Sequence, residues 1–387
     1  MRRLTLTAAV LLAVSCDAAD DPAANLETRI DTVGGVEHVR NVGEAPAWSL
    51  TPVTRIGAID SGPAAFGRIR SVVADGEGRI YVADNMASEI RVFDADGSWL
   101  HTIGRRGGGP GEFGDLYSLA WLGDELVAMD PSNARIGRFT RQGTWIDGIR
   151  HYPITGPGTF VRMHPLGDQG FYVPVIAPGH DRLPFVRITP TGPADTIAVP
   201  AAPESVEAYG LRCDRPDGGI QFISIPDAPT TLFSYPPPGG QIAVAWSEQY
   251  RIARLDPKGD TLAVIHREQA AVPYPDSLWR AAVEPYDQMR ERFPGSRCEP
   301  EALERPESRS AMRDLLFDDT GRMWVEAATP SGFAWDIFAQ SGALLGRAAA
   351  PPRGASVPVY VRGDSLYQVE VDEDGVQYVA VYRLDRT

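Results

Sequence analysis

The sequence predicts an all-β protein: a six-bladed β-propeller with four-stranded blades. A five-residue pattern, in which a large apolar residue and three mostly polar residues precede a glycine, recurs five times along the chain. Each copy separates two segments of alternating polarity, and the first two copies repeat at an offset of 46 residues. A repeat of roughly 40–50 residues built of short strands is typical of propeller blades. The copies are residues 93–97, 139–143, 188–192, 255–259 and 338–342.

Each copy predicts a tight turn between the third and fourth strands of a blade. A hairpin turn needs a residue that tolerates a positive φ, and glycine does so without steric cost. Asp and Pro just before the glycine favour the turn through local hydrogen bonds or a fixed φ. The apolar residue at the start of the pattern is then the last inward anchor of the third strand.

The blades follow one another in chain order, and the last one is incomplete. Blade six contains two alternating segments, 365–372 and 376–385, and no fourth strand follows them. Residues 54–60 precede blade one and belong to no complete blade, so we expect them to supply the missing outer strand. Closing a ring with strands from both ends of the chain removes exposed sheet edges. Blades one to five are expected at 71–104, 116–150, about 160–200, about 231–267 and 312–349.

Length and charge limit the function classes. We expect residues 49–387 to form one domain, because radial β architectures hold such lengths as a single unit. The formal net charge is −14, which disfavours nucleic acid as a partner, because phosphate binding needs a basic face.

The amino terminus reads as an export signal followed by a tether. Arg2 and Arg3 precede a short apolar stretch, 4–14, and residues 13–16 read AVSC, which resembles a bacterial lipobox. The expected signal peptide is 1–15, with Cys16 lipidated, and residues 16–48 form a tether rich in Asp, Ala and Glu. The expected location is the bacterial cell envelope, with the lipid as the membrane contact. Ordinary secretory cleavage a few residues later is the alternative and would give a secreted protein.

Two insertions interrupt the blade period on either side of blade four. The first, about 201–230, contains Cys213, and the second, about 269–310, contains Cys298. Two cysteines in an oxidising compartment are candidates for a disulfide, whereas two unpaired buried thiols are the alternative. From about residue 271 the second insertion has apolar residues at helical spacing, and we expect Pro285 to divide it into two short helices.

Residues 78–113, GRIYVADNMASEIRVFDADGSWLHTIGRRGGGPGEF, resemble an NHL repeat followed by that family's glycine-rich connector. The whole chain resembles the NHL-like six-bladed propellers exported by bacteria, many of them lipoproteins. The resemblance is strongest over 69–150 and weakens in the later blades. It implies a propeller scaffold and assigns no ligand.

Four residues of blades one and two are candidates for a ligand-binding face. Asp84 and Asp130 end equivalent strands, and in NHL-like repeats this Asp usually accepts hydrogen bonds in the following turn. Arg105 and Arg106 begin a basic, glycine-rich segment whose backbone N–H groups can cradle an anion. No P-loop lysine follows, so a plain connector between blades is the competing interpretation.

Two aromatic residues of the second insertion, Trp279 and Tyr286, complete the candidate ligand-binding face. Exposed aromatic residues often mark binding surfaces, while packing is the alternative. None of the six histidines pairs at the spacing of helical metal ligands. His151, His164 and His180 lie around blade three and could converge, although a structural role is favoured for them.

We therefore expect a binding protein more than an enzyme. No catalytic residue is assigned, because no nucleophile motif occurs and no known metal-ligand set matches. The expected partner is a protein, peptide or glycan on the insertion-bearing face, and the expected state is a monomer without cofactor. The alternative is a metal-dependent lactonase, hydrolase or lyase acting at the central pore, which would need Ca²⁺ or Zn²⁺ in a site that the sequence does not locate.

Overall fold

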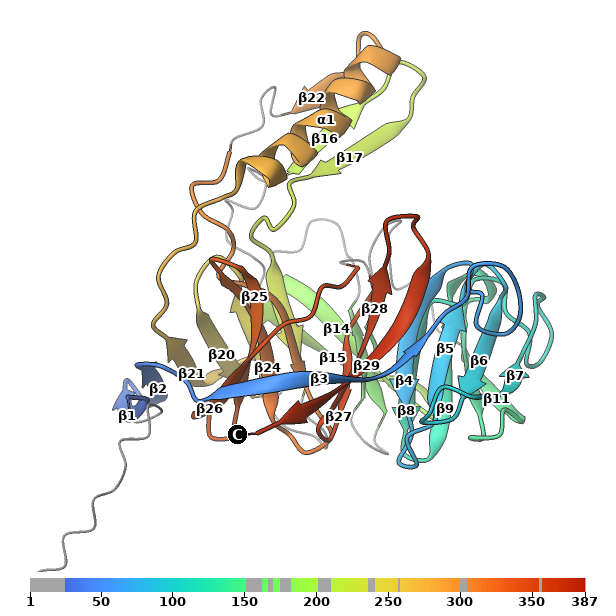
Figure 1. The fold of residues 1–387 in the computed structure, drawn as a ribbon, viewed down its shortest axis with the longest axis horizontal. Helices are drawn as coiled ribbons and strands as arrows, with labels where there is room; N and C mark the ends of the chain where they lie inside the picture. The colour runs from blue at the N-terminus through green and yellow to red at the C-terminus, as the bar shows by residue number, and fades with distance from the viewer. Residues whose placement is uncertain are drawn as a thin grey trace, which may run out of the picture.

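The computed structural model describes residues 25–150, 162–165, 170–174, 182–200, 210–235, 241–256, 258–299, 305–354 and 357–386. These residues form six antiparallel blades with a projecting arm above them (Figure 1). The predicted six-bladed β-propeller is therefore confirmed. In each blade the first strand is innermost and the fourth is outermost.

The first three blades are four-stranded sheets whose strands pair in chain order. Blade one contains β4 (Ile69–Ala74), β5 (Ile80–Asp84), β6 (Glu89–Phe93) and β7 (Trp99–Ile103). Blade two contains β8 (Ser118–Leu122), β9 (Glu125–Asp130), β10 (Arg135–Phe139) and β11 (Trp145–Arg150), with the 3₁₀ turn η1 (Pro131–Asn133) after β9. Blade three contains β12 (His164–Pro165), β13 (Phe171–Pro174), β14 (Arg182–Thr189) and β15 (Gly192–Pro200).

The last three blades include strands contributed by the N-terminal region. Blade four contains β18 (Thr231–Ser234), β19 (Ile242–Trp246), β20 (Arg251–Leu255) and β21 (Thr261–Arg267). Blade five contains β23 (Met312–Phe317), β24 (Met323–Thr329), β25 (Gly332–Phe338) and β26 (Leu344–Ala349). Blade six contains β27 (Tyr360–Arg362), β28 (Ser365–Val371), β29 (Gln377–Asp385) and β3 (Ala47–Ile56).

The turn glycines of the sequence pattern have a second role in packing. Gly97, Gly143 and Gly342 have φ between 86° and 89°, as the turn prediction requires. A Cβ on Gly143 would lie 2.4 Å from Ile103 Cγ1 of the preceding blade's outer strand. A Cβ on Gly342 would likewise lie 2.8 Å from Ile265 Cγ1. Glycine is therefore required both by the turn and by the close approach of the next blade.

The ring closes with β3, as predicted, but the bounds of the predicted strand were wrong. β3 pairs antiparallel with β29 from Ile56–Val379 to Ser49–Asp385, so it spans 47–56 and not 54–60. The register shifts opposite Val381 and Tyr382 and leaves Val53 as an extra residue next to Pro52. This bulge interrupts the alternation of side chains on which the sequence analysis relied. The first half of β3 therefore did not read as a strand.

The prediction of a tether over residues 16–48 was also wrong for its described part. β1 (Glu27–Val33) and β2 (Val36–Val42) form a hairpin, and β2 pairs in parallel with β21, extending blade four to six strands. The buried Asn41 side chain donates to Gly342 O at 3.0 Å and accepts from Leu344 N at 2.9 Å. These long-range contacts hold an acidic segment that composition alone marks as irregular. Residues 1–24, which contain the expected signal peptide and Cys16, lie outside the described residues.

The two insertions combine into one arm. β16 (Gly210–Asp214), β17 (Ile220–Ser224) and β22 (Arg297–Glu299) form a three-stranded sheet beside α1 (Asp276–Arg292), and Figure 1 shows this arm projecting from the ring. The predicted disulfide is confirmed: Cys213 and Cys298 are cross-strand partners with Cα atoms 4.0 Å apart. The expected division at Pro285 was wrong, because α1 is one helix with its proline inside. Burial of Ala282 and Met289 on either side of the proline offsets the hydrogen bond that it removes.

Candidate functional site

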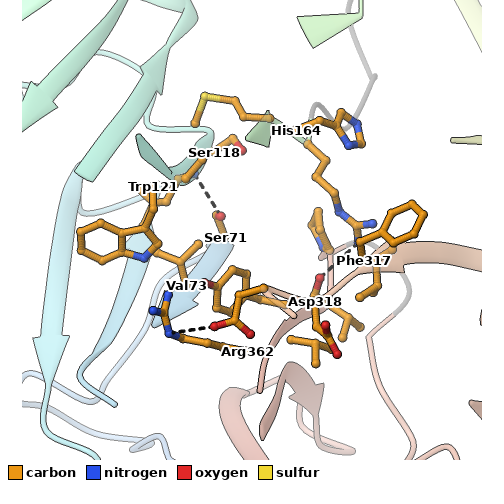
Figure 2. Close-up of a pocket in the computed structure, with 18 of the residues that line it drawn as sticks. Ser71, Val73, Ser118, Trp121, His164, Phe317, Asp318 and Arg362 are labelled. Carbon is orange, nitrogen blue, oxygen red and sulfur yellow. Dashed lines mark hydrogen bonds and ion pairs between the residues drawn. The ribbon is translucent and has the colours of Figure 1, made fainter. Parts of the chain in front are cut away.

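A cavity of about 230 Å³ lies in the central channel, and all six blades contribute to its wall. We call it the channel pocket. Figure 2 shows it surrounded by the innermost strands, with Ser71 and Trp121 on the side opposite His164 and Phe317. It is lined by Ser71–Val73, Ser118–Trp121, Gly123, Arg162–His164, Ser234, Tyr235, Leu316–Asp319 and Pro358–Arg362.

The channel pocket lies toward one end of the channel. Its lining includes the ends of β18, β23 and β27 and residues of the turns that lead to the second strands, such as Gly123 and Asp319. The arm is built from chain that leaves the outermost strands and returns to the innermost strands at their starts. The channel pocket is therefore close to the turn side of the ring, and the arm is on the other side.

The wall of the channel pocket is mainly apolar. Val73, Leu119, Phe317 and Val359 are among the apolar residues that line it, and the phenol of Tyr360 lies between two blades. Burial raises the pKa of Tyr360 to about 12, and its hydroxyl donates to the backbone at Ala74 O over 3.2 Å. Tyr360 is therefore neutral at physiological pH and joins blade six to blade one.

The charges at the mouth of the channel pocket neutralise one another. Asp318 is fully buried and accepts from Arg322 Nε at 2.7 Å and from Trp324 Nε1 at 2.9 Å. Asp319 lies 3.6 Å from Arg362 Nε, and Figure 2 marks this ion pair. The mouth therefore presents paired charges, which do not favour a ligand of either sign.

Arg162 closes the channel on the side toward the arm. Its guanidinium reaches from blade three to the opposite blades, where it donates to Asp314 at 3.2 Å, Leu315 O at 3.3 Å and Val359 O at 3.2 Å. Arg353 binds the same Asp314. Although burial opposes it, these two guanidinium groups lower the pKa of Asp314. The carboxylate thus stays ionised, and it anchors the arginine across the channel.

The carboxylate of Glu326 completes this charged network. Glu326 is fully buried and accepts two hydrogen bonds from Arg313, at 2.8 and 2.6 Å, as well as bonds from Arg353. The Arg313 guanidinium also lies 3.6 Å from the centroid of the Phe333 ring. Buried charges held by several partners are costly to separate. The network therefore holds Arg162 and its partners in place on the arm side of the channel pocket.

Two buried polar groups of the lining have no hydrogen-bond partner among the described residues. They are His164 Nε2 and Tyr235 OH, on side chains that are each 3% exposed. Burial and the nearby Arg162 lower the pKa of His164 to about 3, so its imidazole is neutral. Burial likewise raises the pKa of the Tyr235 phenol well above its usual range. Unpaired buried groups are rare in native proteins and call for an explanation.

Asp84 and Asp130 are fully buried, and each holds the loop before the first strand of its own blade. Asp84 accepts from Gly67 N at 2.9 Å and Arg68 N at 3.0 Å, in the chain just before β4. Asp130 accepts from Gly114 N at 3.0 Å and from Asp115 N at 2.9 Å, in the equivalent place before β8. The structural role that the NHL-like resemblance implies accounts for these contacts.

Arg105 and Arg106 hold the connector between blades one and two. Arg105 pairs with Glu112 at 2.9 Å, and Glu112 also accepts from Gly109 N, so a carboxylate occupies the glycine-rich segment. Arg106 donates to Met86 O at 2.9 Å. An anion would have to displace Glu112 to reach these backbone N–H groups.

Trp279 and Tyr286 lie on α1 and are half-buried in the two small cores of the arm. Trp279 packs against the cluster of Ile225, Tyr274 and Ala282. Tyr286 packs against Cys213 and Met289, next to the disulfide. The structure thus separates the six predicted face residues into one group at blades one and two and another on the arm. Ligand contact by either group stays a prediction.

The histidines form no metal site among the described residues. His164 lies in the channel pocket, whereas His151 and His180 fall outside the described residues. His38 of the N-terminal hairpin and His266 of blade four share a 3.0 Å contact between Nδ1 and Nε2. No group of three or more His, Cys, Asp or Glu side chains is placed to hold a metal ion in the part of the chain that is described. Within the same part, no helix is both long and apolar enough to cross a membrane.

Sequence reasoning missed most of the channel pocket. One local signal was available for its mouth: an Asp followed four residues later by Arg and six residues later by an aromatic residue. It occurs at Asp75 and at Asp318, and each aspartate accepts hydrogen bonds from both of its followers. The repeat marks the turns between first and second strands, and so the open end of the channel.

A family model described as a 6-bladed beta-propeller, DUF5128, matches residues 64–164. The match covers blades one and two and the start of blade three, about a quarter of the chain. It agrees with the six blades of the structure. No curated protein matches the chain.

Several solved structures are similar to this one at low identity. A Bacteroides fragilis protein described as exported is 11% identical, with a TM-score of 0.43, and the match covers 87% of this chain and 95% of that one. Virginiamycin B lyase from Staphylococcus aureus is 10% identical, with a TM-score of 0.36 and coverage of 87% and 99%. Regucalcin from Agrobacterium tumefaciens, described as calcium-binding, is 12% identical, with a TM-score of 0.39 and coverage of 89% and 98%. These likenesses carry no argument about what this chain binds.

Proposed function

We propose that this protein is an extracytoplasmic binding protein that takes a small, uncharged, largely apolar ligand in the channel pocket. The observation that carries this proposal is the cavity of about 230 Å³, lined by all six blades and closed on one side by Arg162. Enclosed, mainly apolar cavities with a few polar groups are typical of small-molecule sites. The neutralised mouth favours an uncharged ligand.

The experiment measures the binding of 2-methylnaphthalene, an uncharged hydrocarbon small enough for the cavity, by quenching of tryptophan fluorescence and by calorimetry. From ligand efficiencies of small molecules we expect a Kd on the order of 10 µM. Ser118→Leu fills part of the channel pocket and should weaken binding at least tenfold. Ser61→Leu, on an exposed turn, is the matched control and should leave binding unchanged. Binding that Ser118→Leu does not affect would place the probe elsewhere and refute the proposal.

A second proposal concerns the arm, the part of the insertion-bearing face that the sequence analysis favoured for a protein, peptide or glycan. The disulfide favours this role, because it fixes a unit that stands away from the ring and contributes nothing to ring closure. Deleting the arm, with a short linker from Pro200 to Thr231 and another from Arg267 to Met312, should leave the propeller folded. A partner identified by cross-linking in the native envelope should be lost with the arm and retained after Ser118→Leu.

Export, lipidation at Cys16 and a monomeric state belong to the same proposal. The enzyme alternative would place Ca²⁺ or Zn²⁺ at the channel axis. Metal analysis of the protein purified without chelators tests it: a stoichiometric ion would favour the enzyme. The binding proposal needs no cofactor and makes no use of nucleic acid.

A further inference from the structure

His164 and Tyr235 meet at the boundary between blades three and four, where both line the channel pocket. Their ring centroids are 5.3 Å apart and the rings are tilted by 56°. Neither His164 Nε2 nor Tyr235 OH has a hydrogen-bond partner in the described chain, although both atoms are buried. Figure 2 shows His164 at the edge of the cavity. Both residues line the cavity, so a ligand within it lies against both side chains.

Among the described residues, the surroundings of the two side chains supply no other partner. His164 lies against Phe185 and Phe233, with ring centroids 6.2 and 5.2 Å away, and Tyr235 stacks on Tyr172 at 4.6 Å. These are apolar ring contacts. Leaving a polar group unpaired in such a place lowers stability unless the group has another use. A ligand-binding site whose polar groups are already in place contains such unpaired groups before the ligand binds. The two side chains beside the cavity fit that description.

The hydrogen-bonding capacities of the two groups define the ligand group that fits. A phenol donates one hydrogen bond and accepts others, and a neutral imidazole nitrogen either donates or accepts, depending on its tautomer. A ligand hydroxyl can accept from Tyr235 and donate to His164 at the same time, or do the reverse. A carboxylate can only accept and would bring an unpaired charge, while an ammonium can only donate.

We propose that the ligand of the channel pocket is an uncharged, largely apolar molecule with a hydroxyl group that hydrogen-bonds to both His164 and Tyr235. This inference rests on the proposed function and names the ligand class. The apolar body of the ligand lies against the aliphatic and aromatic wall formed by residues such as Val73 and Phe317. The hydroxyl is directed to the boundary between blades three and four.

The test compares three naphthalenes with different substituents: 2-naphthol, 2-methylnaphthalene and 2-naphthoate. In the wild-type protein, 2-naphthol should bind about tenfold more tightly than 2-methylnaphthalene, the gain expected of hydrogen bonds that satisfy buried groups. The naphthoate should bind at least tenfold more weakly than the naphthol. Tyr235→Phe and His164→Phe should each reduce the preference for the naphthol to twofold or less. Tyr172→Phe removes a hydroxyl from the adjacent ring, which does not line the cavity, and should keep the preference.

Stability gives a second measurement that does not depend on any probe. If the two groups are unpaired in the free protein, Tyr235→Phe and His164→Phe should leave Tm unchanged or raise it by roughly 1–3 °C. A fall in Tm of several degrees in Tyr235→Phe, which removes only the hydroxyl, would show that this hydroxyl has a protein partner and would overturn the inference.

The outcomes separate this inference from the proposed function. Equal binding of 2-naphthol and 2-methylnaphthalene by the wild type, or a preference that survives both phenylalanine variants, would overturn the hydroxyl assignment and leave the channel pocket as an apolar site. If neither probe binds, both the inference and the proposed function fail. A naphthol preference lost in both variants and kept in Tyr172→Phe supports the inference.

Discussion

Cys298→Ser should loosen the arm while the six blades remain folded. The disulfide joins residues 85 apart in sequence, and the intervening chain includes all of blade four. When only the arm opens, blade four stays folded, so the loop that the disulfide closes is shorter. It consists of the two segments between blade four and the cysteines, about 50 residues together, for which chain entropy gives about 4 kcal/mol.

The apolar contacts within the arm are few, so the disulfide should dominate its stability. Of the 17 residues of α1, two, Ala282 and Met289, are buried. A loss of about 4 kcal/mol corresponds to an increase of about a thousandfold in the population of the open arm. Residual structure and strain reduce this value, so we expect between thirtyfold and a thousandfold.

Hydrogen exchange measured by mass spectrometry tests this expectation. Amides of β16, β22 and α1 should exchange faster by that factor in Cys298→Ser, and amides of β5, β9 and β24 should change less than twofold. Wild-type protein treated with a reductant and the double variant with Cys213→Ser are the controls, and both should reproduce the single variant. Uniform loss of protection across the blades, or unchanged protection in the arm, would refute the reasoning.

Four further predictions concern the ring, its charges and its anchor. Deleting residues 1–42 removes the N-terminal hairpin and should lower Tm slightly. Deleting 1–56 also removes β3 and should abolish cooperative unfolding. Equal melting of the two truncations would contradict ring closure by β3. Because burial and Arg162 lower the pKa of His164 to about 3, the unfolded chain takes up a proton below about pH 6.5 that the native chain does not, so this group should remove about 2 kcal/mol of stability between pH 7 and pH 5. Urea titrations at both pH values should show that loss in the wild type and a correspondingly smaller one in His164→Phe. Glu326→Gln removes the carboxylate that Arg313 binds and one of the two carboxylates that the buried Arg353 binds, and should cost about 3–5 kcal/mol; a change below 1 kcal/mol would show that the network does not hold the channel wall in place. Cys16→Ser should release the protein from the membrane fraction, and a wild-type protein that begins at a later residue without lipid by mass spectrometry would contradict lipidation.

The blades could be predicted because their constraints are local. Each turn glycine is required by a positive backbone φ that only a few residue types adopt. The segments on either side alternate between apolar and polar residues with a period of two, which the sequence shows directly. The predicted ends of blades four and five, 231–267 and 312–349, coincide with the ends of β18, β21, β23 and β26. Blade three was located less sharply, since its first strand has two residues.

The N-terminal hairpin could not be predicted in the same way. β2 pairs with β21 in parallel, so the two strands share no turn, and more than 200 residues separate them. Its main anchor, Asn41, bonds to backbone atoms of blade five, around Gly342. A buried asparagine in an acidic segment gives no sign in the sequence of where its partners lie. The turn at Gly34 and Gly35 was a local signal, and it marks a hairpin between two alternating runs.

The channel pocket could not be predicted from the sequence, because each blade supplies only two to five ordinary residues to it. A serine, a valine or a leucine on an innermost strand has no feature that separates it from the same residue elsewhere in a blade. His164 was noticed together with His151 and His180 as neighbours in sequence. Its partner in the described structure is Tyr235 of the next blade, more than 70 residues away. Only the closure of the propeller brings the imidazole of His164 next to the phenol of Tyr235.

The Arg162 network separates the two proposed binding regions physically. A ligand that approached the channel pocket from the arm would have to displace a guanidinium with three acceptors on blades five and six, and it would leave Asp314 and Arg353 only partly compensated. Breaking such a buried network costs several kcal/mol, more than the hydrogen bonds of a small ligand return. Entry through the turn side meets ion pairs that already face solvent, such as Asp319 with Arg362. A partner held by the arm can therefore leave the mouth of the channel pocket open.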